Sequence, residues 1–278
     1  MKISALKEQI LRKKTFLCVG LDSDIKKLPN SVRSADDPVF EFNKAVIDAT
    51  QAYAVAFKPN TAFYEQLGAK GWDSLQRTAE YIKTNYPELF LIADAKRGDI
   101  GNTSKMYART FFEQMPFDAV TVAPYMGHDS VTPFLEFNNK HVILLALTSN
   151  PGASDFQLKT LPGSGMLYEE VLRVSKHWGN ENALMYVTGA TKAEKLETIR
   201  RHIPKHFLLV PGIGAQGGDL KSVIQNGLTP DGGLLINSSR GIIFADDSKN
   251  FANSAAKQAQ KLQTQMAEIA GVFFENTL

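Results

Sequence analysis

The sequence predicts an α/β fold, a (β/α)8 TIM barrel with an extra N-terminal helix and a C-terminal helical extension. Eight short apolar runs rich in β-branched residues recur along the 278 residues, and segments long enough for a helix separate them. The runs are almost continuously apolar, as in parallel strands covered on both faces. Eight such units favour a closed barrel. A doubly wound sheet is the alternative, because periodicity alone does not establish closure.

The helices between the strands begin and end at typical residues. Residues 36–51 begin with acidic residues and place Pro38 in the first turn. Residues 218–227 place Asp219 at the start and Gly227 at the end. The charged, amphipathic first 14 residues predict the extra helix, and residues 251–278 the last helix and the extension. We expect one domain over residues 1–278. The predicted strands are residues 15–22, 53–59, 89–96, 118–124, 141–148, 183–190, 206–213 and 233–239.

Composition narrows the class of protein. The net charge is +2, from 31 basic and 29 acidic residues, which gives no reason to expect a nucleic-acid or membrane partner. The N-terminus has the features of neither a signal peptide nor a membrane span. A single cysteine, Cys18, excludes an internal disulfide framework, and we interpret it as a small buried hydrophobic residue. These observations predict a cytoplasmic protein.

Charged residues gather where the predicted strands end. Asp22 follows the first strand, Lys58 ends the second, and Asp94, Lys96 and Asp99 follow one another at the end of the third. In such barrels the chemistry lies at the C-terminal ends of the strands. Asp94 and Lys96 are two residues apart, so they face the same side, where Lys58 could complete an alternating row. A structural ion-pair network would explain the row too, but its place at the barrel mouth favours function.

The seventh and eighth strand ends predict a phosphate site. Residues 211–218 are rich in glycine, so backbone N–H groups can approach an anion closely. Arg240 follows the eighth strand and suits bidentate phosphate binding, and Gln216 could add a donor. Barrels of this class commonly bind phosphate at these two loops. The alternative is an ordinary glycine-rich turn beside a solvated arginine.

The same loop also matches the dinucleotide motif G-x-G-x-x-G through Gly212, Gly214 and Gly217. That interpretation requires an acidic residue at the end of the next strand, which instead ends in Asn237 and Ser238. No metal cluster or cofactor motif is evident, and we interpret the scattered histidines, His202 and His206 included, as surface residues. Residues 148–166 predict a long loop whose length suggests function.

Four segments in this order resemble orotidine 5′-phosphate decarboxylases. Residues 94–103, DAKRGDIGNT, resemble the signature of the longer-chain bacterial branch of that family. FKPN at 57–60, TSNPG at 148–152 and PGIGAQGG at 211–218 also match, and the similarity extends from residue 22 to residue 240. The resemblance implies a cofactor-free enzyme of de novo pyrimidine biosynthesis, which converts orotidine 5′-phosphate to UMP and CO2. It also implies a homodimer with shared active sites.

The resemblance also implies a role for each matching residue. Lys96 would protonate C6 of the pyrimidine, Asp94 would lie beside the departing carboxylate, and Lys58 would bind the ribose and orient Asp94 in a row completed by Asp99. One position departs from the pattern, because some relatives have a phosphate-binding tyrosine where this chain has Ile243. The substrate would be bound by Asp22 at the ribose, by Ser149 at the base and by Gln216 and Arg240 at the phosphate. Ile100 and Thr103 would bind it in the neighbouring subunit's site, into which the catalytic Asp99 would also reach.

Two other functions remain open at this point. A magnesium-dependent sugar-phosphate decarboxylase or aldolase of the same suprafamily shares the pattern D-x-K-x-x-D. Those relatives usually carry an acidic metal ligand near the second strand, which here ends in Lys58. A non-catalytic binder of nucleotide phosphates is the second alternative, although every member of the charged row is present.

Overall fold

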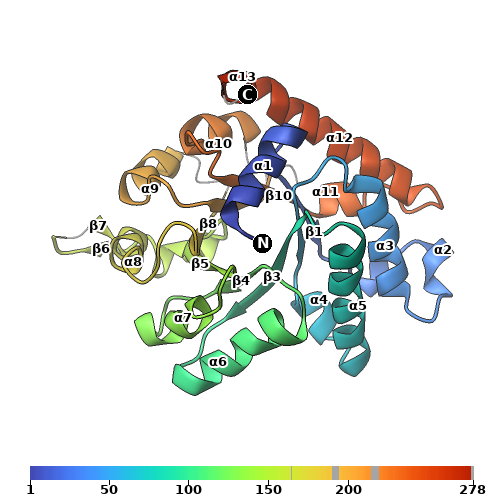
Figure 1. Ribbon diagram of the computed structural model, residues 1–278, viewed down its shortest axis with the longest axis horizontal. Helices are drawn as coiled ribbons and strands as arrows, with labels where there is room; N and C mark the ends of the chain where they lie inside the picture. Colours follow the sequence, from blue (N-terminus) through green and yellow to red (C-terminus); the bar gives the residue numbers. More distant parts are fainter. Residues whose placement is uncertain (164, 190–193, 214–218, 277–278) are drawn as a thin grey trace.

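Eight parallel strands close into a barrel in the computed structural model, which describes residues 1–163, 165–189, 194–213 and 219–276. The strands follow one another around the barrel in chain order, and the last pairs with the first (Figure 1). The predicted barrel is therefore confirmed, and the doubly wound sheet is excluded. The strands are β1 (Leu17–Leu21), β2 (Ala56–Pro59), β3 (Phe90–Arg97), β4 (Ala119–Val122), β5 (His141–Leu147), β8 (Leu184–Thr188), β9 (Leu208–Pro211) and β10 (Leu234–Ser238).

Helices surround the barrel in a ring (Figure 1). The longer ones are α1 (Ile3–Lys13), α3 (Pro38–Thr50), α5 (Ala69–Asn85), α6 (Gly101–Arg109), α7 (His128–Leu135), α8 (Leu167–Ser175), α9 (Leu196–His202), α10 (Leu220–Gly227) and α12 (Phe251–Ile269). The shorter ones are η1 (Ile25–Lys27), α2 (Asn30–Arg33), α4 (Ala62–Glu65), η2 (Thr110–Gln114), η3 (Pro151–Ser154), α11 (Arg240–Ile243) and α13 (Gly271–Asn276).

The helix starts follow from the residues predicted to cap them. The Asp37 side chain accepts the Phe40 N–H at the start of α3, and Asp219 accepts the Lys221 N–H at the start of α10. The predicted first helix is α1, which lies across the N-terminal end of the barrel (Figure 1). The predicted C-terminal extension forms α12 and α13.

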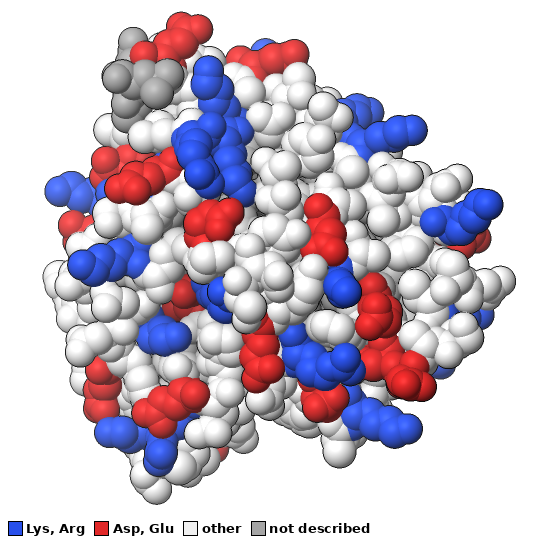
Figure 2. All heavy atoms as spheres, turned by 45° about the vertical axis from the view of Figure 1, so that its right-hand side comes forward, with Lys and Arg blue, Asp and Glu red and all other residues white. Residues whose placement is uncertain are grey.

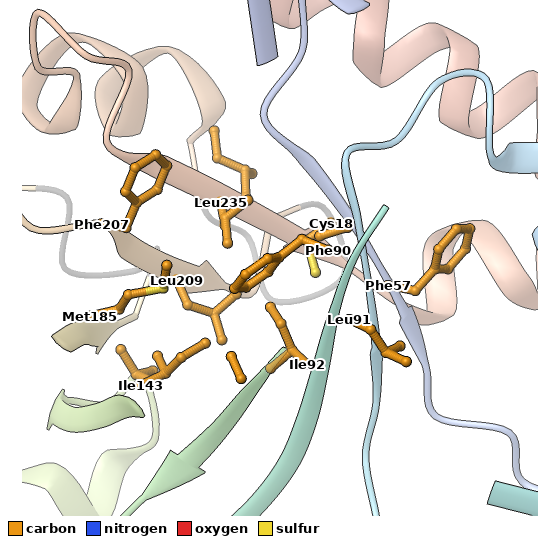
Figure 3. Packing of buried hydrophobic residues seen from close by; sticks show 14 of the residues in the cluster. Cys18, Phe57, Phe90, Leu91, Ile92, Ile143, Met185, Phe207, Leu209 and Leu235 are labelled. Atoms are coloured by element: carbon orange, nitrogen blue, oxygen red, sulfur yellow. The ribbon is translucent and has the colours of Figure 1, made fainter. Parts of the chain in front are cut away.

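The barrel interior below the site is apolar. Ile92, Met185 and Leu209 come together inside it, whereas Phe57 lies on the outer side of its strand (Figure 3). Cys18 is fully buried, as expected, and burial raises the pKa of its thiol to about 12. Side chains alternate along a strand, so the residue two positions beyond each inward residue also faces inward. Ile92 is followed in this way by Asp94, which therefore enters the top layer of the barrel.

Arg200 ties together the N-terminal ends of two strands. From α9 its guanidinium donates to the carbonyls of Gly227, His206 and Gly233 at 2.8, 2.6 and 2.8 Å. These carbonyls lie at the end of α10 and just before β9 and β10. Hydrogen bonds from a charged donor are among the stronger ones in proteins. Arg200 thus fixes the starts of the two strands whose opposite ends carry the predicted phosphate site.

Two histidines correct the interpretation of that residue type as a surface residue. His206 is buried against Tyr186, with ring centroids 5.5 Å apart, and burial lowers the pKa of its imidazole to about 4. His141 is also buried and contacts the carbonyls of Asn182 and Met1 through its two ring nitrogens. The sequence around a lone histidine does not reveal such burial, because the aromatic ring that packs against His206 comes from a different strand. An uncharged imidazole packs well against such a ring.

The predicted long loop at residues 148–166 contains ordered structure. It holds η3 and an antiparallel pair of short strands, β6 (Thr160–Leu161) and β7 (Gly165–Met166). The Gln157 side chain accepts the Thr148 N–H at 2.7 Å and so holds the segment against the end of β5. Residue 164, residue 190 of the sixth predicted strand and residues 214–218 of the glycine-rich loop lie outside the described residues.

Positive and negative side chains are interspersed on the face shown in Figure 2. Such mixing agrees with the nearly balanced charge of the sequence. Within the described residues, the structure has no helix of the length and apolar character that crossing a membrane requires.

Candidate active site

The centre of the site is the carboxylate of Asp94, which two ammonium groups share. Lys58 from β2 lies 2.8 Å from Oδ2, and Lys96 from the end of β3 lies 2.6 Å from Oδ1. Asp22 from the end of β1 lies on the other side of Lys58, with 4.0 Å between Oδ1 and Nζ. Asp94 and Lys58 are almost fully enclosed, whereas the Lys96 side chain is 51% exposed. Three neighbouring strands therefore build an alternating row of acids and bases.

Mutual attraction keeps the inner part of this row charged. Burial by itself would raise the pKa of Asp94, but Lys58 and Lys96 outweigh burial and hold the pKa well below the usual carboxyl range. Burial would likewise lower the pKa of Lys58, but Asp94 and Asp22 outweigh it and raise that pKa. A negative carboxylate and a positive ammonium therefore persist together at neutral pH in a nearly water-free position.

The backbone at Lys96 departs from a regular strand. The residue has a φ of 46°, in the left-handed region that few side-chain-bearing residues adopt. The pairing of β3 with β4 shifts register between Ala93 and Arg97. The Lys96 N–H donates to the hydroxyl of Thr121 at 2.8 Å instead of to a backbone carbonyl. Irregularities of this kind re-aim side chains next to active sites.

Arg97 secures the same stretch from outside the barrel. Its guanidinium forms an ion pair with Glu65 on α4 and lies over the rings of Tyr107 and Phe111, 5.4 and 5.7 Å from their centroids. Neighbouring residues of β3 thus point in opposite directions, Lys96 towards the row and Arg97 into the packing between α4 and α6. This outer contact restrains the end of the strand on which the row depends.

A cavity of about 180 Å³ opens beside the row. Asp22 and Asn237 both line it, and the Oδ1 atom of each is buried without a hydrogen-bond partner within the described part of the chain. Such acceptors suit a ligand that brings hydroxyl or N–H donors. The cavity is lined by Asp22, Lys58, Asn60, Asp94, Pro211, Gly212, Ile213, Asn237, Ser239 and Arg240.

The far side of the cavity combines a glycine of positive φ with an arginine. Gly212 has a φ of 101°, which favours glycine, and Arg240 is the first residue of α11. Gly20 on β1 is needed for close approach, because a Cβ there would lie 1.9 Å from the Ser239 hydroxyl. Ile243, at the position where the resemblance implies a tyrosine in some relatives, is buried, and its side chain has no polar group. Arg240 and backbone groups are therefore the described candidates for anion binding here.

The other predicted residues lie outside this cavity. Asp99 and Ile100 lie between β3 and α6, Thr103 lies in the first turn of α6, and Ile100 is 54% exposed. Ser149 follows β5 and packs against Gly189, where a Cβ would lie 2.7 Å from that of Ser149. Gln216 lies outside the described residues. Lys96 does not line the cavity, but its ammonium contacts Asp94, which does.

Two residues of the site were missed by the sequence interpretation. Thr121 on β4 donates to Asp94 Oδ1 at 3.0 Å as well as accepting the Lys96 N–H. Asn237 on β10 faces the cavity, and its amide donates to the Ser239 hydroxyl at 3.2 Å. The available signal was a polar residue at an inward position of an apolar strand, although threonine is also common in strands for packing alone.

The described side chains that could act as metal ligands give no support to a metal centre. Within the described residues, no group of three or more His, Cys, Asp or Glu side chains is arranged to hold a metal ion. The carboxylates of the row are instead occupied by lysines. The arrangement is suited to chemistry in which a fixed ammonium meets a developing negative charge.

Comparison with known proteins identifies relatives of nearly full length. The model of the family described as "Orotidine 5'-phosphate decarboxylase / HUMPS family" matches residues 15–255. The orotidine 5′-phosphate decarboxylase of Christiangramia forsetii is 62% identical over 268 residues, which cover 96% of this chain and 98% of the relative. The same-named protein of Phocaeicola vulgatus is 58% identical over 269 residues, which cover 97% and 99%.

Solved structures of proteins with the same name have the same fold. A structure described as a putative orotidine-monophosphate-decarboxylase from Toxoplasma gondii superposes with a TM-score of 0.88 at 32% identity, covering 99% of this chain and 98% of that one. The OMP decarboxylase of Leishmania donovani superposes with a TM-score of 0.77 at 34% identity, covering 95% and 99%.

The buried row predicts a pH-dependent stability. Asp94→Asn should lower the free energy of unfolding at pH 7 by about 3–5 kcal/mol, because Lys58 stays buried without its carboxylate. The pKa of Asp94 is lower in the folded chain than in the unfolded chain, so its contribution is present above the usual carboxyl range and is lost as the pH falls below about 4. The difference between wild type and variant should therefore narrow in urea unfolding as the pH is lowered from 4 to 3.

A surface pair provides the control for this measurement. Asp231 pairs with Lys7 at 2.9 Å but is 56% exposed, so Asp231→Asn should change the free energy of unfolding by less than about 1 kcal/mol. A difference between wild type and Asp94→Asn that stayed constant down to pH 3 would contradict the proposed ionisation of Asp94.

Proposed function

We propose a residue-by-residue mechanism for this chain, which belongs to the orotidine 5′-phosphate decarboxylase / HUMPS family and converts orotidine 5′-phosphate to UMP and CO2. The observation that carries the proposal is the Asp94 carboxylate held between Lys58 and Lys96 beside a cavity that ends at Arg240. The substrate has a carboxylated base at one end and a phosphate at the other, and the cavity offers a matching group for each.

The substrate is oriented by its phosphate. In the proposal Arg240 and the backbone at Gly212 bind the phosphate, and Gln216 adds a donor. The ribose hydroxyls donate to the carboxylate of Asp22 and meet Lys58, which both line the cavity. The base then extends over the row towards Ser149, with its carboxylate beside Asp94.

The chemical step breaks the bond between C6 and the carboxylate carbon. The electron pair of that bond stays on C6, CO2 departs, and a proton from the Lys96 ammonium forms the new C6–H bond. The carbanion at C6 has no adjacent π system to delocalise it, so a fixed positive charge must stabilise it. The half-exposed Lys96 side chain can then recover a proton from water.

Repulsion between Asp94 and the substrate carboxylate cannot supply the whole of the catalysis. Two like charges about 4 Å apart repel by roughly 4 kcal/mol at an effective dielectric near 20, which bounds the contribution of Asp94 against the substrate carboxylate. Enzymes lower barriers by about 8–23 kcal/mol. The remainder is supplied by the preorganised ammonium and by binding energy from the remote phosphate.

The active form in this proposal is a homodimer with shared sites. Asp99, Ile100 and Thr103 lie outside their own cavity and extend into that of the partner, where Asp99 completes the charged row. Exposed apolar side chains on and near α6 support this arrangement. These exposed apolar residues are Ile100, Met106, Tyr107, Tyr125 and Met126.

The proposed enzyme works in the cytoplasm, and its chain forms one domain over residues 1–278.

The first test combines turnover with removal of Lys96. Purified wild type should consume orotidine 5′-phosphate in the presence of EDTA, followed as the loss of orotate-type ultraviolet absorbance. Lys96→Ala should lower kcat by at least about 10⁴-fold, because it removes both the stabilising charge and the proton donor. Lys257→Ala on the exposed face of α12 is the control and should leave turnover unchanged. Substantial turnover by Lys96→Ala would overturn its role, and EDTA-sensitive turnover would indicate a metal-dependent mechanism.

Arg240 is tested with a substrate that lacks the phosphate. Arg240→Ala should lower kcat/KM for orotidine 5′-phosphate by about 10²-fold or more, since a charge-assisted bidentate contact is lost. The same substitution should have little effect on the slow turnover of orotidine, which has no phosphate to bind. Equal losses for the two substrates would show that Arg240 does not act through the phosphate.

Shared sites are tested by mixing two inactive variants. In a hybrid dimer of Lys96→Ala and Asp99→Ala, one site receives both intact residues and the other receives neither. Random exchange of subunits at equal concentrations makes half of the dimers hybrids, so about a quarter of wild-type activity should return. If the mixture stays as inactive as its components after verified exchange, Asp99 does not serve the neighbouring site.

A further inference from the structure

We infer that Thr121 is a positioning residue for the decarboxylation, because its single hydroxyl fixes the backbone of Lys96 and the carboxylate of Asp94 together. The inference rests on the proposed function, since it gives Thr121 a role through those two residues. Thr121 is 1% exposed and faces the barrel interior from β4, directly beside the charged row.

The two hydrogen bonds of the hydroxyl have fixed directions. The Lys96 N–H can only donate, and it donates to Thr121 Oγ1 at 2.8 Å. The ionised Asp94 can only accept, so the Thr121 O–H donates to its Oδ1 at 3.0 Å. Lys96 Nζ lies 2.6 Å from the same oxygen. Thr121 therefore closes a ring that joins the two ends of Lys96, its backbone nitrogen and its ammonium, through one carboxylate oxygen.

This ring explains how the chain holds Lys96 in a left-handed conformation. A φ of 46° is unfavourable for lysine and persists only where its surroundings determine it. The regular pairing of β3 with β4 is interrupted there and resumes where the Ala123 N–H donates to the Arg97 carbonyl at 2.8 Å. The Thr121 side chain thus replaces the missing backbone acceptor at the residue whose ammonium must meet the substrate.

Packing alone would not require a hydroxyl at this position. Valine has the same branched shape and a high preference for strands, and Ile143, which pairs with Thr121 from β5, is apolar. A valine would fill the space but would leave the Lys96 N–H without this acceptor and Asp94 with one donor fewer. Misplacement of a catalytic group by about 1 Å can lower a rate by about 10²-fold.

The test separates the hydroxyl from the shape of the side chain. Thr121→Val should lower kcat by about 10–100-fold, with KM for orotidine 5′-phosphate and the Kd for UMP within about threefold of wild type. Thr121→Ser keeps the hydroxyl and should stay within about threefold of wild-type kcat. Thr121→Ala and Thr121→Ser differ by one hydroxyl at nearly equal volume, so this pair gives the same comparison if the valine variant fails to fold.

Thr188→Val provides a matched control. Thr188 is a buried strand threonine on β8 whose hydroxyl has no partner in the described part of the chain. The Thr188→Val variant should keep the wild-type kcat and the wild-type melting temperature. Wild-type kcat in Thr121→Val would overturn the inference, as would equal losses in Thr121→Ser and Thr121→Ala, or a rise in KM alone. Turnover by the wild type in the same assay shows that the proposed function itself holds.

Discussion

The structure of the site depends on one buried carboxylate shared between two ammonium groups. Removing a carboxylate from water costs several kcal/mol, and Asp94 recovers that cost only with both lysines in place. Its Oδ2 lies 2.8 Å from Lys58 Nζ, and its Oδ1 lies 2.6 Å from Lys96 Nζ. Lys58 is just as dependent on Asp94, since it is itself almost fully buried. Neither partner can move far without leaving an uncompensated charge, so the row is rigid before substrate arrives.

The parallel barrel is what brings these groups together. Every strand of the barrel ends at the same face, and inward residues of neighbouring strands lie side by side at that end. The apolar interior below the row excludes water from beneath it (Figure 3). The charged row occupies the ends of β1 to β3, whereas Arg240 and Gly212 lie at the ends of β10 and β9 across the cavity. In the proposed mechanism the phosphate is thus held at a distance from the reacting carbon, as the use of remote binding energy requires.

The sequence was sufficient for the barrel and for the meeting of Asp22, Lys58, Asp94 and Lys96 at one end of it, but not for their supporting contacts. Apolar runs and capping residues specify the strands and helices, and charges at strand ends stand out because burial there is costly. Thr121 did not stand out, because threonine suits a strand for packing reasons alone. The burial of His206 also escaped notice, since it depends on Tyr186 from a neighbouring strand. Sequence patterns report local preference, whereas these contacts depend on which strands the closed barrel makes adjacent.

The unusual backbone at Lys96 follows from the same constraint. A lysine on a regular strand has a long, flexible side chain, and reorganising it in each turnover would reduce its electrostatic effect on a carbanion. Here the backbone is held at a φ of 46° and the ammonium is held by Asp94, so the charge is placed before the reaction begins. Strain of about 1–3 kcal/mol in one residue is small beside the barrier lowering that an ordered charge can supply. In the proposed mechanism the irregular end of β3 is therefore part of the catalytic apparatus and not a defect in the barrel.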